Sequence, residues 1–266
     1  MKNIKYGISM LLIVFVYSCN QEDKLVLSPT FDYEQIGINH NKGLDYIFES
    51  LKKQKELIKG DVQTYMSIVE VAGVEYVEAS NYKISAESMD LIKEGISVSV
   101  GKFKNFSVAR LSSSEDLYTQ IIGDSDSLLS KVQRDYIHEI LSLMENETDI
   151  DSFLVRLSII EQNANETLIL DEQPLILSVA SVARYSQVYW EDNREKWLNE
   201  FGGNNNSGRI QIDWGIVAGA DVASGIAMGI ACTPAVAGGP VGWGFATLAI
   251  AGAAAVGSGG AIWATW

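Results

Sequence analysis

The chain has little that could cross-link it covalently, because it contains two cysteines, Cys19 and Cys232, among 266 residues. We expect Cys19 to be used by the export signal described below, which leaves no pair for an internal disulfide bond. Stability must then come from an ordinary hydrophobic core. The roughly 190 residues between the N-terminal signal and the C-terminal tail are enough for one such domain.

Histidine is equally scarce, and the usual catalytic motifs are missing. Asp135 precedes His138 by three residues, but Ser142 stands where a second ligand on the same helix face would lie. We therefore expect His138 on a solvated helix face, and His40, beside Asn41, at the entry of a helix. The region before the tail has no nucleophile elbow, phosphate-binding loop, zinc spacing or nicotinamide fingerprint. The sequence predicts a protein that is not an enzyme and needs no cofactor or metal.

Basic side chains are too few to balance the acidic ones, at 20 against 34. Without Lys2 and Lys5, which lie in the export signal, 18 basic residues remain and the net charge is -16. A negative surface repels phosphate backbones, so we expect no nucleic-acid partner. It also offers no basic patch to anionic lipids, so membrane attachment has to come from acyl chains or apolar segments.

The C-terminal tail lacks charge almost completely. From Gly215 to Trp266 the one charged residue is Asp221, and glycine and alanine fill 27 of the 52 positions. Such a segment belongs in lipid or in a close helix-on-helix contact.

The N-terminus has the pattern of an export signal. Lys2 and Lys5 precede an apolar run over Tyr6–Tyr17. At about 12 residues this run is too short to span a bilayer, but it fits the apolar part of a signal peptide. The following Val16-Tyr17-Ser18-Cys19 resembles the lipobox of bacterial lipoproteins, with valine for the commoner leucine and a bulky tyrosine. The resemblance implies that residues 1–18 are removed and that Cys19 is acylated.

The residues that follow Cys19 indicate where in the cell envelope the protein is located. Gln21-Glu22-Asp23 resembles the acidic signal that directs lipoproteins of Bacteroides-type bacteria to the outside of the cell. We therefore expect the protein at the outer membrane or cell surface, held by lipid on Cys19.

The middle of the chain has helical periodicity. After a tether over 19–34, we expect an acidic all-α domain over 35–201 with five or six packed helices. Its apolar positions recur at helical spacing, as in Leu44, Ile47, Phe48 and Leu51. Asn41 is a candidate cap for the first helix, and Asp126 or Ser127 for the helix over 128–144.

Two other segments of this region are informative. The β-branched and aromatic residues over 96–108 could form a strand or an irregular bridge. Pro174 suits the first turn of a last helix that continues toward Trp197.

Two short segments carry a resemblance to a family. They are His40-Asn41-Lys42-Gly43-Leu44-Asp45 and Ser181-Val182-Ala183-Arg184-Tyr185-Ser186 with Tyr189-Trp190. Together they are similar to uncharacterised exported lipoproteins of Bacteroides-like bacteria, a group that implies no activity. Tyr185 and Tyr189 could form an aromatic ledge for a sugar or a peptide, although a place in the core and rim of the last helix is the stronger expectation.

The tail divides into two arms. The first, Trp214–Cys232, would reach roughly 28 Å as a helix, near the thickness of the hydrocarbon layer. A centre with proline and glycine over 233–240 separates it from the second arm, which ends at Trp266. A linker over 202–213 thus leads into a hydrophobic helical hairpin over 214–266. Small residues at a spacing of four allow its helices to approach closely, and the candidate packing positions are Gly215, Gly219, Gly225, Gly229, Ala249, Ala253 and Gly257.

The hairpin would also gather tryptophans at one level. Trp214 at its start would lie near Trp263 and Trp266 at its end, as in the aromatic belts of membrane interfaces. Asp221, near one end of the first arm, would lie at the interface or face the partner helix as a protonated or bonded group.

Two functions follow. The tail resembles the Gly-zipper segments of class II bacteriocins, which implies a cell-envelope lipoprotein with a membrane-inserting tail that binds lipid and self-associates. The alternative is a non-enzymatic surface scaffold or interaction protein whose tail packs on its own helical domain. No protein partner is indicated by the sequence.

Overall fold

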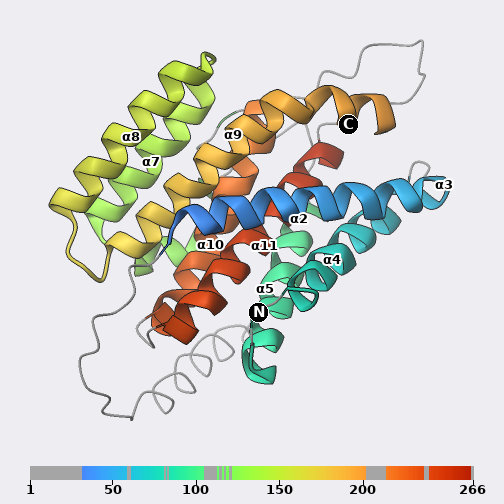
Figure 1. The fold of residues 1–266 in the computed structure, drawn as a ribbon, viewed down its shortest axis with the longest axis horizontal. Coiled ribbons are helices and arrows are strands. Elements are labelled where there is room, and N and C mark those ends of the chain that lie inside the picture. Colours follow the sequence, from blue (N-terminus) through green and yellow to red (C-terminus); the bar gives the residue numbers. More distant parts are fainter. Residues whose placement is uncertain are drawn as a thin grey trace.

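The Gly/Ala-rich tail lies inside a set of amphipathic helices in the computed structural model (Figure 1). The structure describes residues 32–58, 61–80, 82, 84–104, 113, 116, 118–119, 122–201, 214–236 and 240–264. These residues contain helices and no strand, which confirms the all-α prediction. The signal peptide, Cys19, most of the expected tether and the linker over 202–213 lie outside the described residues.

The described residues form nine α-helices and one 3₁₀-helix. In chain order they are α2 (Glu34–Lys53), α3 (Lys55–Ile58), α4 (Val62–Glu78), α5 (Ala86–Lys104), the 3₁₀-helix η2 (Gly123–Leu128), α7 (Lys131–Asn146), α8 (Ile150–Thr167), α9 (Gln173–Phe201), α10 (Trp214–Val236) and α11 (Pro240–Ala264).

Local sequence signals explain several helix starts. Asp61 caps α4 by accepting from the backbone N–H of Gln63. Ser130 caps α7 in a reciprocal capping box with Gln133, so the prediction of Asp126 or Ser127 as the cap was wrong. Those two residues lie in η2 instead.

Two further starts concern the first and last helices of the middle region. Asn41 was also a wrong choice of cap, because α2 already begins at Glu34. Pro174 lies in the first turn of α9, as expected.

The described part of the segment over 96–108, residues 96–104, differs from the expectation of a strand or bridge, because α5 continues as a helix to Lys104. Its apolar side chains fall at helical spacing on one buried face, which consists of Ile92, Ile96, Val100 and Phe103. Packing of this face outweighs the modest helix penalty of β-branched residues.

Helices α10 and α11 form the centre of the fold. They pack along each other, α11 contacts α2, α4 and α5, and α10 contacts α9 and α7 (Figure 1). A helix that is apolar around its whole circumference needs cover on every side, and the amphipathic helices provide it. The hairpin and the region before it therefore share one hydrophobic core. We call α2, α4, α5 and α9 the sleeve.

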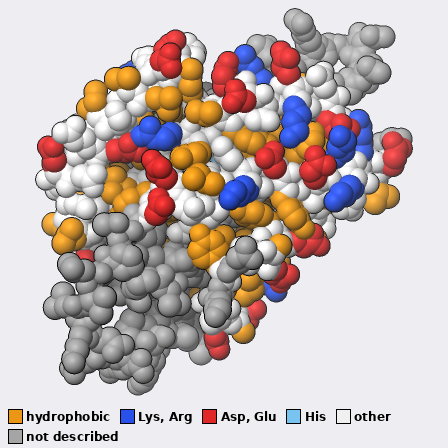
Figure 2. Space-filling model, viewed as in Figure 1, with side chains coloured by type: hydrophobic (Ala, Val, Ile, Leu, Met, Phe, Trp, Pro, Cys, Tyr) orange, Lys and Arg blue, Asp and Glu red, His pale blue; other side chains and the backbone are white. Residues whose placement is uncertain are grey.

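The outer surface of the sleeve is charged. In Figure 2, acidic and basic side chains are intermingled with apolar atoms over the described part of one face. Ion pairs such as Lys52 and Lys55 with Glu200, at 3.7 and 3.0 Å, link helices on this exposed side. Exposed pairs of this kind contribute little stability, so the buried apolar contacts between sleeve and hairpin hold the fold together.

Candidate functional site

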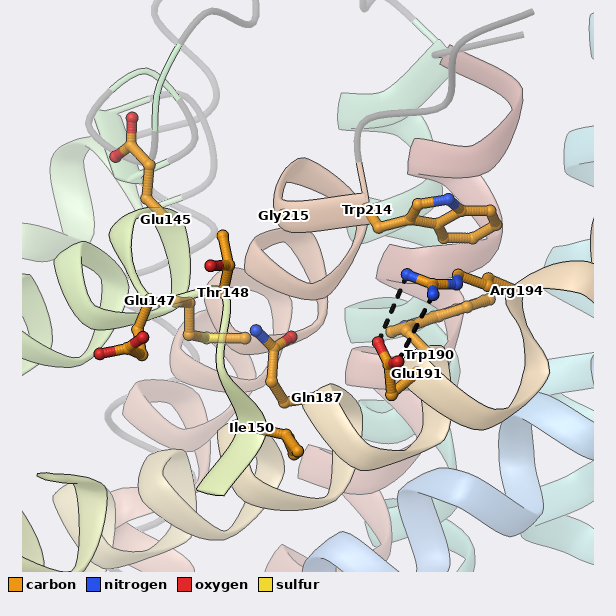
Figure 3. A pocket seen from close by; sticks show the side chains of 11 residues that line it. Glu145, Glu147, Thr148, Ile150, Gln187, Trp190, Glu191, Arg194, Trp214 and Gly215 are labelled. Carbon is orange, nitrogen blue, oxygen red and sulfur yellow. Dashed lines mark hydrogen bonds and ion pairs between the residues drawn. The ribbon is translucent and has the colours of Figure 1, made fainter. Parts of the chain in front are cut away.

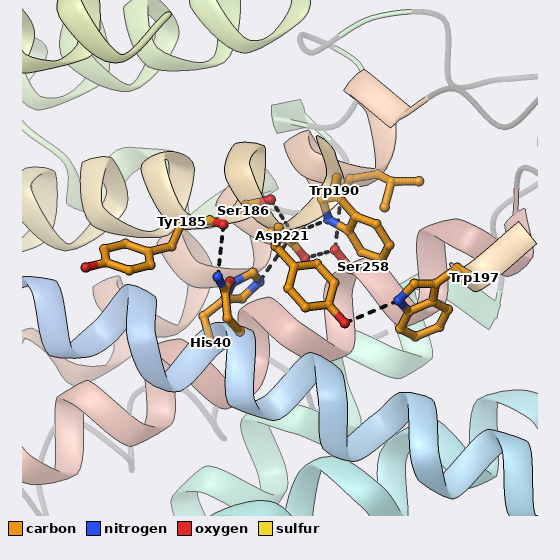
Figure 4. Close-up of polar contacts among 10 residues, drawn as sticks. His40, Tyr185, Ser186, Trp190, Trp197, Asp221 and Ser258 are labelled. Carbon is orange, nitrogen blue, oxygen red and sulfur yellow. Dashed lines mark hydrogen bonds and ion pairs between the residues drawn. The ribbon is translucent and has the colours of Figure 1, made fainter. Parts of the chain in front are cut away.

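The one charged residue of the hairpin is fully enclosed by protein. Asp221 lies in the second turn of α10 and has no exposed surface. Its Oδ2 accepts hydrogen bonds from Ser186 Oγ at 2.5 Å and from Trp190 Nε1 at 3.1 Å, both on α9. Its Oδ1 accepts from Ser258 Oγ on α11 (Figure 4). Three neutral donors from two helices thus satisfy a carboxylate that apolar surroundings alone would not accept.

A histidine from a third helix completes the arrangement. His40 on α2 is also fully buried, and its Nε2 lies 3.2 Å from Asp221 Oδ2. The two atoms are within hydrogen-bond distance, but the ring is not directed at the oxygen as a good hydrogen bond requires. The contact therefore brings two ionisable side chains together without a hydrogen bond between them. Asp221, His40, Ser186, Trp190 and Ser258 are called the Asp221 network below.

The neighbours of His40 determine its tautomer. Asn41 Nδ2 donates to the backbone carbonyl of Tyr185 at 3.2 Å, which fixes the orientation of the amide. Asn41 Oδ1 then faces His40 Nδ1 at 2.9 Å and can only accept. Nδ1 must therefore carry a hydrogen, and Nε2 is the ring nitrogen that faces Asp221.

A second layer surrounds the network on the α9 side. The Tyr189 hydroxyl donates to Asp45 Oδ1 at 3.1 Å and accepts from Trp197 Nε1 at 3.2 Å. Burial raises the pKa of Tyr189, and the carboxylates of Asp45 and Asp221 add to this effect, so the phenol stays neutral at physiological pH.

The structure brings together the two segments that carry the family resemblance. His40, Asn41 and Asp45 come from the first segment, and Ser186 and Trp190 from the second. Tyr189 and Trp190 are buried, whereas the ring of Tyr185 points away from the network (Figure 4). The aromatic side chains of α9 thus belong to the core and its rim, and they form no open ledge.

Sequence reasoning singled out His40, Ser186, Trp190 and Asp221 but not Ser258, and it did not place them together. Asp221 stood out as the one charge in an apolar tail, but its partners come from three other helices. His40 was expected at a helix entry and lies within α2 instead. His138 is only half-buried, with its ring centroid 4.4 Å from that of Tyr118.

The small residues of the hairpin are not equally necessary. A Cβ atom on Gly257 would lie 2.6 Å from the carbonyl oxygen of Ala220, so the closest approach of α10 and α11 requires glycine there. On Gly225 it would lie 3.5 Å or more from its neighbours Ile250 and Ala254, which is ordinary contact. On Gly229 its nearest neighbour would be Leu175 of α9, at 2.5 Å, and Ile250 of the partner arm would lie 3.6 Å away.

The remaining predicted packing positions are mostly enclosed. Ala249 and Ala253 have no exposed surface. Gly219 is buried and Gly215, at the start of α10, is half-buried. The small-residue row thus faces both the partner arm and the sleeve.

The tryptophans meet in a different combination from the one expected. Trp214 is half-buried and stacks on Trp190 with ring centroids 5.2 Å apart. The side chains of Trp263 and Trp266 lie outside the described residues.

A cavity of about 260 Å³ opens beside this stack, and the ion pair of Glu191 and Arg194, at 3.3 Å, borders it (Figure 3). Its residues come from α9, the start of α10 and the α7–α8 connection. Trp190 therefore connects this surface opening with the Asp221 network.

The two ionisable side chains of the network, His40 and Asp221, can hold charge and exchange protons. His40 and Asp221 are inaccessible to a substrate in this conformation. Among the described residues no three metal-binding side chains come together. What the arrangement can do is hold the one charge of the hairpin inside the sleeve.

Comparisons with known proteins add no further assignment. No family model, curated protein or solved structure matches the chain.

Cys232 provides a native probe of the packed hairpin. It lies buried in α10 as a free thiol, and burial raises its pKa to about 12. The thiolate is the reactive form, so we expect Cys232 in a Cys19→Ser chain to react with a thiol reagent at least about 100-fold more slowly than after denaturation in urea. The absorbance of released thionitrobenzoate measures this rate. Equal rates in native and denatured protein would contradict the packing of α10.

Proposed function

We propose that this protein is a cell-envelope lipoprotein, held by acylated Cys19, that stores a membrane-inserting helical hairpin inside a sleeve and delivers it to lipid. The observation that carries the proposal is that α10 and α11 are apolar helices whose one ionisable side chain, Asp221, is enclosed and hydrogen-bonded by groups of the sleeve and of α11. The proposal covers self-association of inserted hairpins through their small-residue faces.

The dimensions of the hairpin support lipid insertion. The Trp214–Cys232 stretch of α10 has the length and composition of a membrane span, although most of it is buried by protein here. The apolar stretch Ala246–Ile262 of α11 is shorter, at 17 residues, and reaches the lower end of the spanning range. A buried core helix has the same composition, so length alone decides nothing and the argument rests on how the hairpin is held.

The contacts between sleeve and hairpin are of a kind that lipid can replace. Most are apolar, such as that of Gly43 on α2 with Ala255 on α11. A polar contact outside the Asp221 network is the hydrogen bond from the Tyr65 hydroxyl to the carbonyl of Gly259, at 2.9 Å. Within the hairpin, the backbone hydrogen bonds are already satisfied by the helices, as a bilayer requires.

A reversible staple between sleeve and hairpin tests the proposal. A Cβ on Gly43 would lie 3.0 Å from that of Ala255, which is closer than the roughly 3.5–4.5 Å of a disulfide, so a small separation of α2 and α11 admits the bridge. We expect the pair Gly43→Cys and Ala255→Cys, in a full chain with Cys19→Ser and Cys232→Ser, to reduce calcein release from phospholipid vesicles at least about tenfold when oxidised. Reductant added to the same sample should restore release, because the covalent tie keeps α11 in the sleeve until it is cut.

The chain offers a matched control within the hairpin. A Cβ on Gly225 would lie 3.6 Å from that of Ala254, so Gly225→Cys with Ala254→Cys joins α10 to α11 and leaves the sleeve free. This oxidised protein should still permeabilise vesicles. Equal inhibition by both staples would contradict delivery of the hairpin as a unit.

The alternative is a scaffold or interaction protein whose tail serves as its core. The shared hydrophobic core favours it, because a central hairpin can be purely structural. Under this alternative neither the reduced nor the oxidised proteins release calcein, and removal of the tail abolishes the helical fold. Release by the reduced protein would exclude it.

A further inference from the structure

We infer that His40 and Asp221 form a proton-operated latch: the pair holds one shared proton while the hairpin is stored, and a second proton releases the hairpin. The biological consequence rests on the proposed function, but the latch itself can be tested in water without a membrane. The inference comes from the geometry of two fully buried ionisable side chains on two different helices.

The first step is to count protons. Because Asn41 requires a hydrogen on His40 Nδ1, a neutral His40 would place its unprotonated Nε2 3.2 Å from the carboxylate oxygen Oδ2 of Asp221. Two electron-rich atoms at that distance repel each other. One proton between Nε2 and Oδ2 removes the repulsion, and the pair is then neutral as a whole. The stored state therefore has one proton on the pair in addition to that on Nδ1.

The second step is to add another proton. Both side chains then carry their own, so the carboxyl group is neutral and the imidazolium is left as an uncompensated positive charge without exposed surface. A buried charge without a partner is strongly unfavourable. Outside the sleeve, His40 is hydrated and Asp221 enters lipid as a neutral acid. The same proton thus weakens storage and removes the last charge of the hairpin.

Among the described residues next to the pair, no other charged group could compensate a net charge on His40 and Asp221. From α9, the titratable side chain that faces the pair is Tyr189, whose phenol stays neutral because burial raises its pKa. Ser186 and Trp190 of α9 and Ser258 of α11 are neutral donors. Behind Tyr189, the ion pair of Asp45 with Lys196, at 3.3 Å, is half-exposed and faces water. Among the described residues around Asp221, His40 is therefore the one cationic partner.

Linkage fixes the sign of the effect. The released state of the wild-type chain binds the second proton more readily than the stored state, so the stability of the stored state falls as the pH falls. In His40→Gln the stored state buries a carboxylate that keeps three neutral donors but has no cationic partner, and protonation removes its charge. The stability contributed by this site must then rise as the pH falls. The double variant His40→Gln with Asp221→Asn has no ionisable group at the site and reports the response of all the surface charges.

The experiment compares melting temperatures of these three full chains, each with Cys19→Ser, from about pH 7 to about pH 4. Relative to the double variant, we expect the wild-type chain to lose about 5–10 °C and His40→Gln to gain a few degrees. Alkylation of Cys232 should accelerate in the wild-type chain over the same range, because release exposes α10. Parallel curves for the three chains would overturn the latch. If the double variant is not helical by circular dichroism, the opposite signs of the other two decide.

Calcein release measured on the same chains separates the two proposals. Acid-dependent release by the wild-type chain, reduced in the double variant, supports both. The predicted melting shifts without any vesicle release would keep the latch and overturn the proposed function. Release that is independent of pH and equal in all chains would keep the proposed function and overturn the latch.

Discussion

Replacing Asp221 with alanine is expected to lower the free energy of unfolding by about 3–5 kcal/mol. The substitution leaves His40 buried without its partner and removes the acceptor of three hydrogen bonds, from Ser186, Trp190 and Ser258. Each donor left unsatisfied in the core adds to the loss. Urea denaturation of the full chain, followed by circular dichroism, measures the change.

A double-mutant cycle separates the contribution of the contact between His40 and Asp221 from the total loss. His40→Ala, Asp221→Ala and the double variant form a cycle, and we expect a coupling energy of about 2 kcal/mol between the two side chains. Asp45→Ala is the matched control, because that carboxylate is more than half exposed although it contacts Tyr189 and Lys196. Its loss should cost less than about 1 kcal/mol. Similar costs for Asp221→Ala and Asp45→Ala would show that the buried network does not hold the hairpin.

Replacing Gly257 with alanine is expected to destabilise the protein by about 1–3 kcal/mol. The added methyl group would lie 2.6 Å from the backbone oxygen of Ala220, and a backbone atom cannot move aside as the end of a side chain can. The helices α10 and α11 must then separate, which also disturbs the neighbouring Ser258 and its bond to Asp221. The midpoint of urea denaturation is the measurement.

The hairpin contains its own control for this substitution. Gly225→Ala places the same methyl group in ordinary contact with Ile250 and Ala254. Alanine is the better helix former by about 1 kcal/mol, so this variant should be as stable as the wild-type chain or more so. An equal loss at both positions would mean that the effect at Gly257 does not come from the close approach of α10 and α11 there.

Particular residues show how far local patterns reach. The apolar spacing of Leu44, Ile47, Phe48 and Leu51 indicated a helix with one buried face, and all four are buried in α2. The proline and glycine centre of the tail indicated a break, and α10 ends at Val236 while α11 begins at Pro240. The β-branched residues of α5 led to a wrong prediction of a strand or bridge, because their preference for strands is weaker than the packing of one apolar helix face.

The position of the hairpin could not be read in the same way. A helix that is apolar all round has the same composition in lipid as in the centre of a bundle, since both surroundings demand the absence of charge. Likewise, the apolar stripes of α2, α4, α5 and α9 do not specify which helix each of them packs against. The contacts of α11 with three helices of the sleeve, α2, α4 and α5, answer that question for the conformation described here.

By itself, then, the sequence determined an all-α protein with an acidic body and two apolar arms that contain one charge. Those properties follow from periodicity, composition and breakers, which act over a few residues along the chain. Only the tertiary structure decided that the arms lie inside the body, and that Asp221 meets His40, Ser186, Trp190 and Ser258. The physical reason is that burial and ion pairing depend on which helices are neighbours in space, and no local pattern in α10 specifies that its aspartate will meet a histidine on α2.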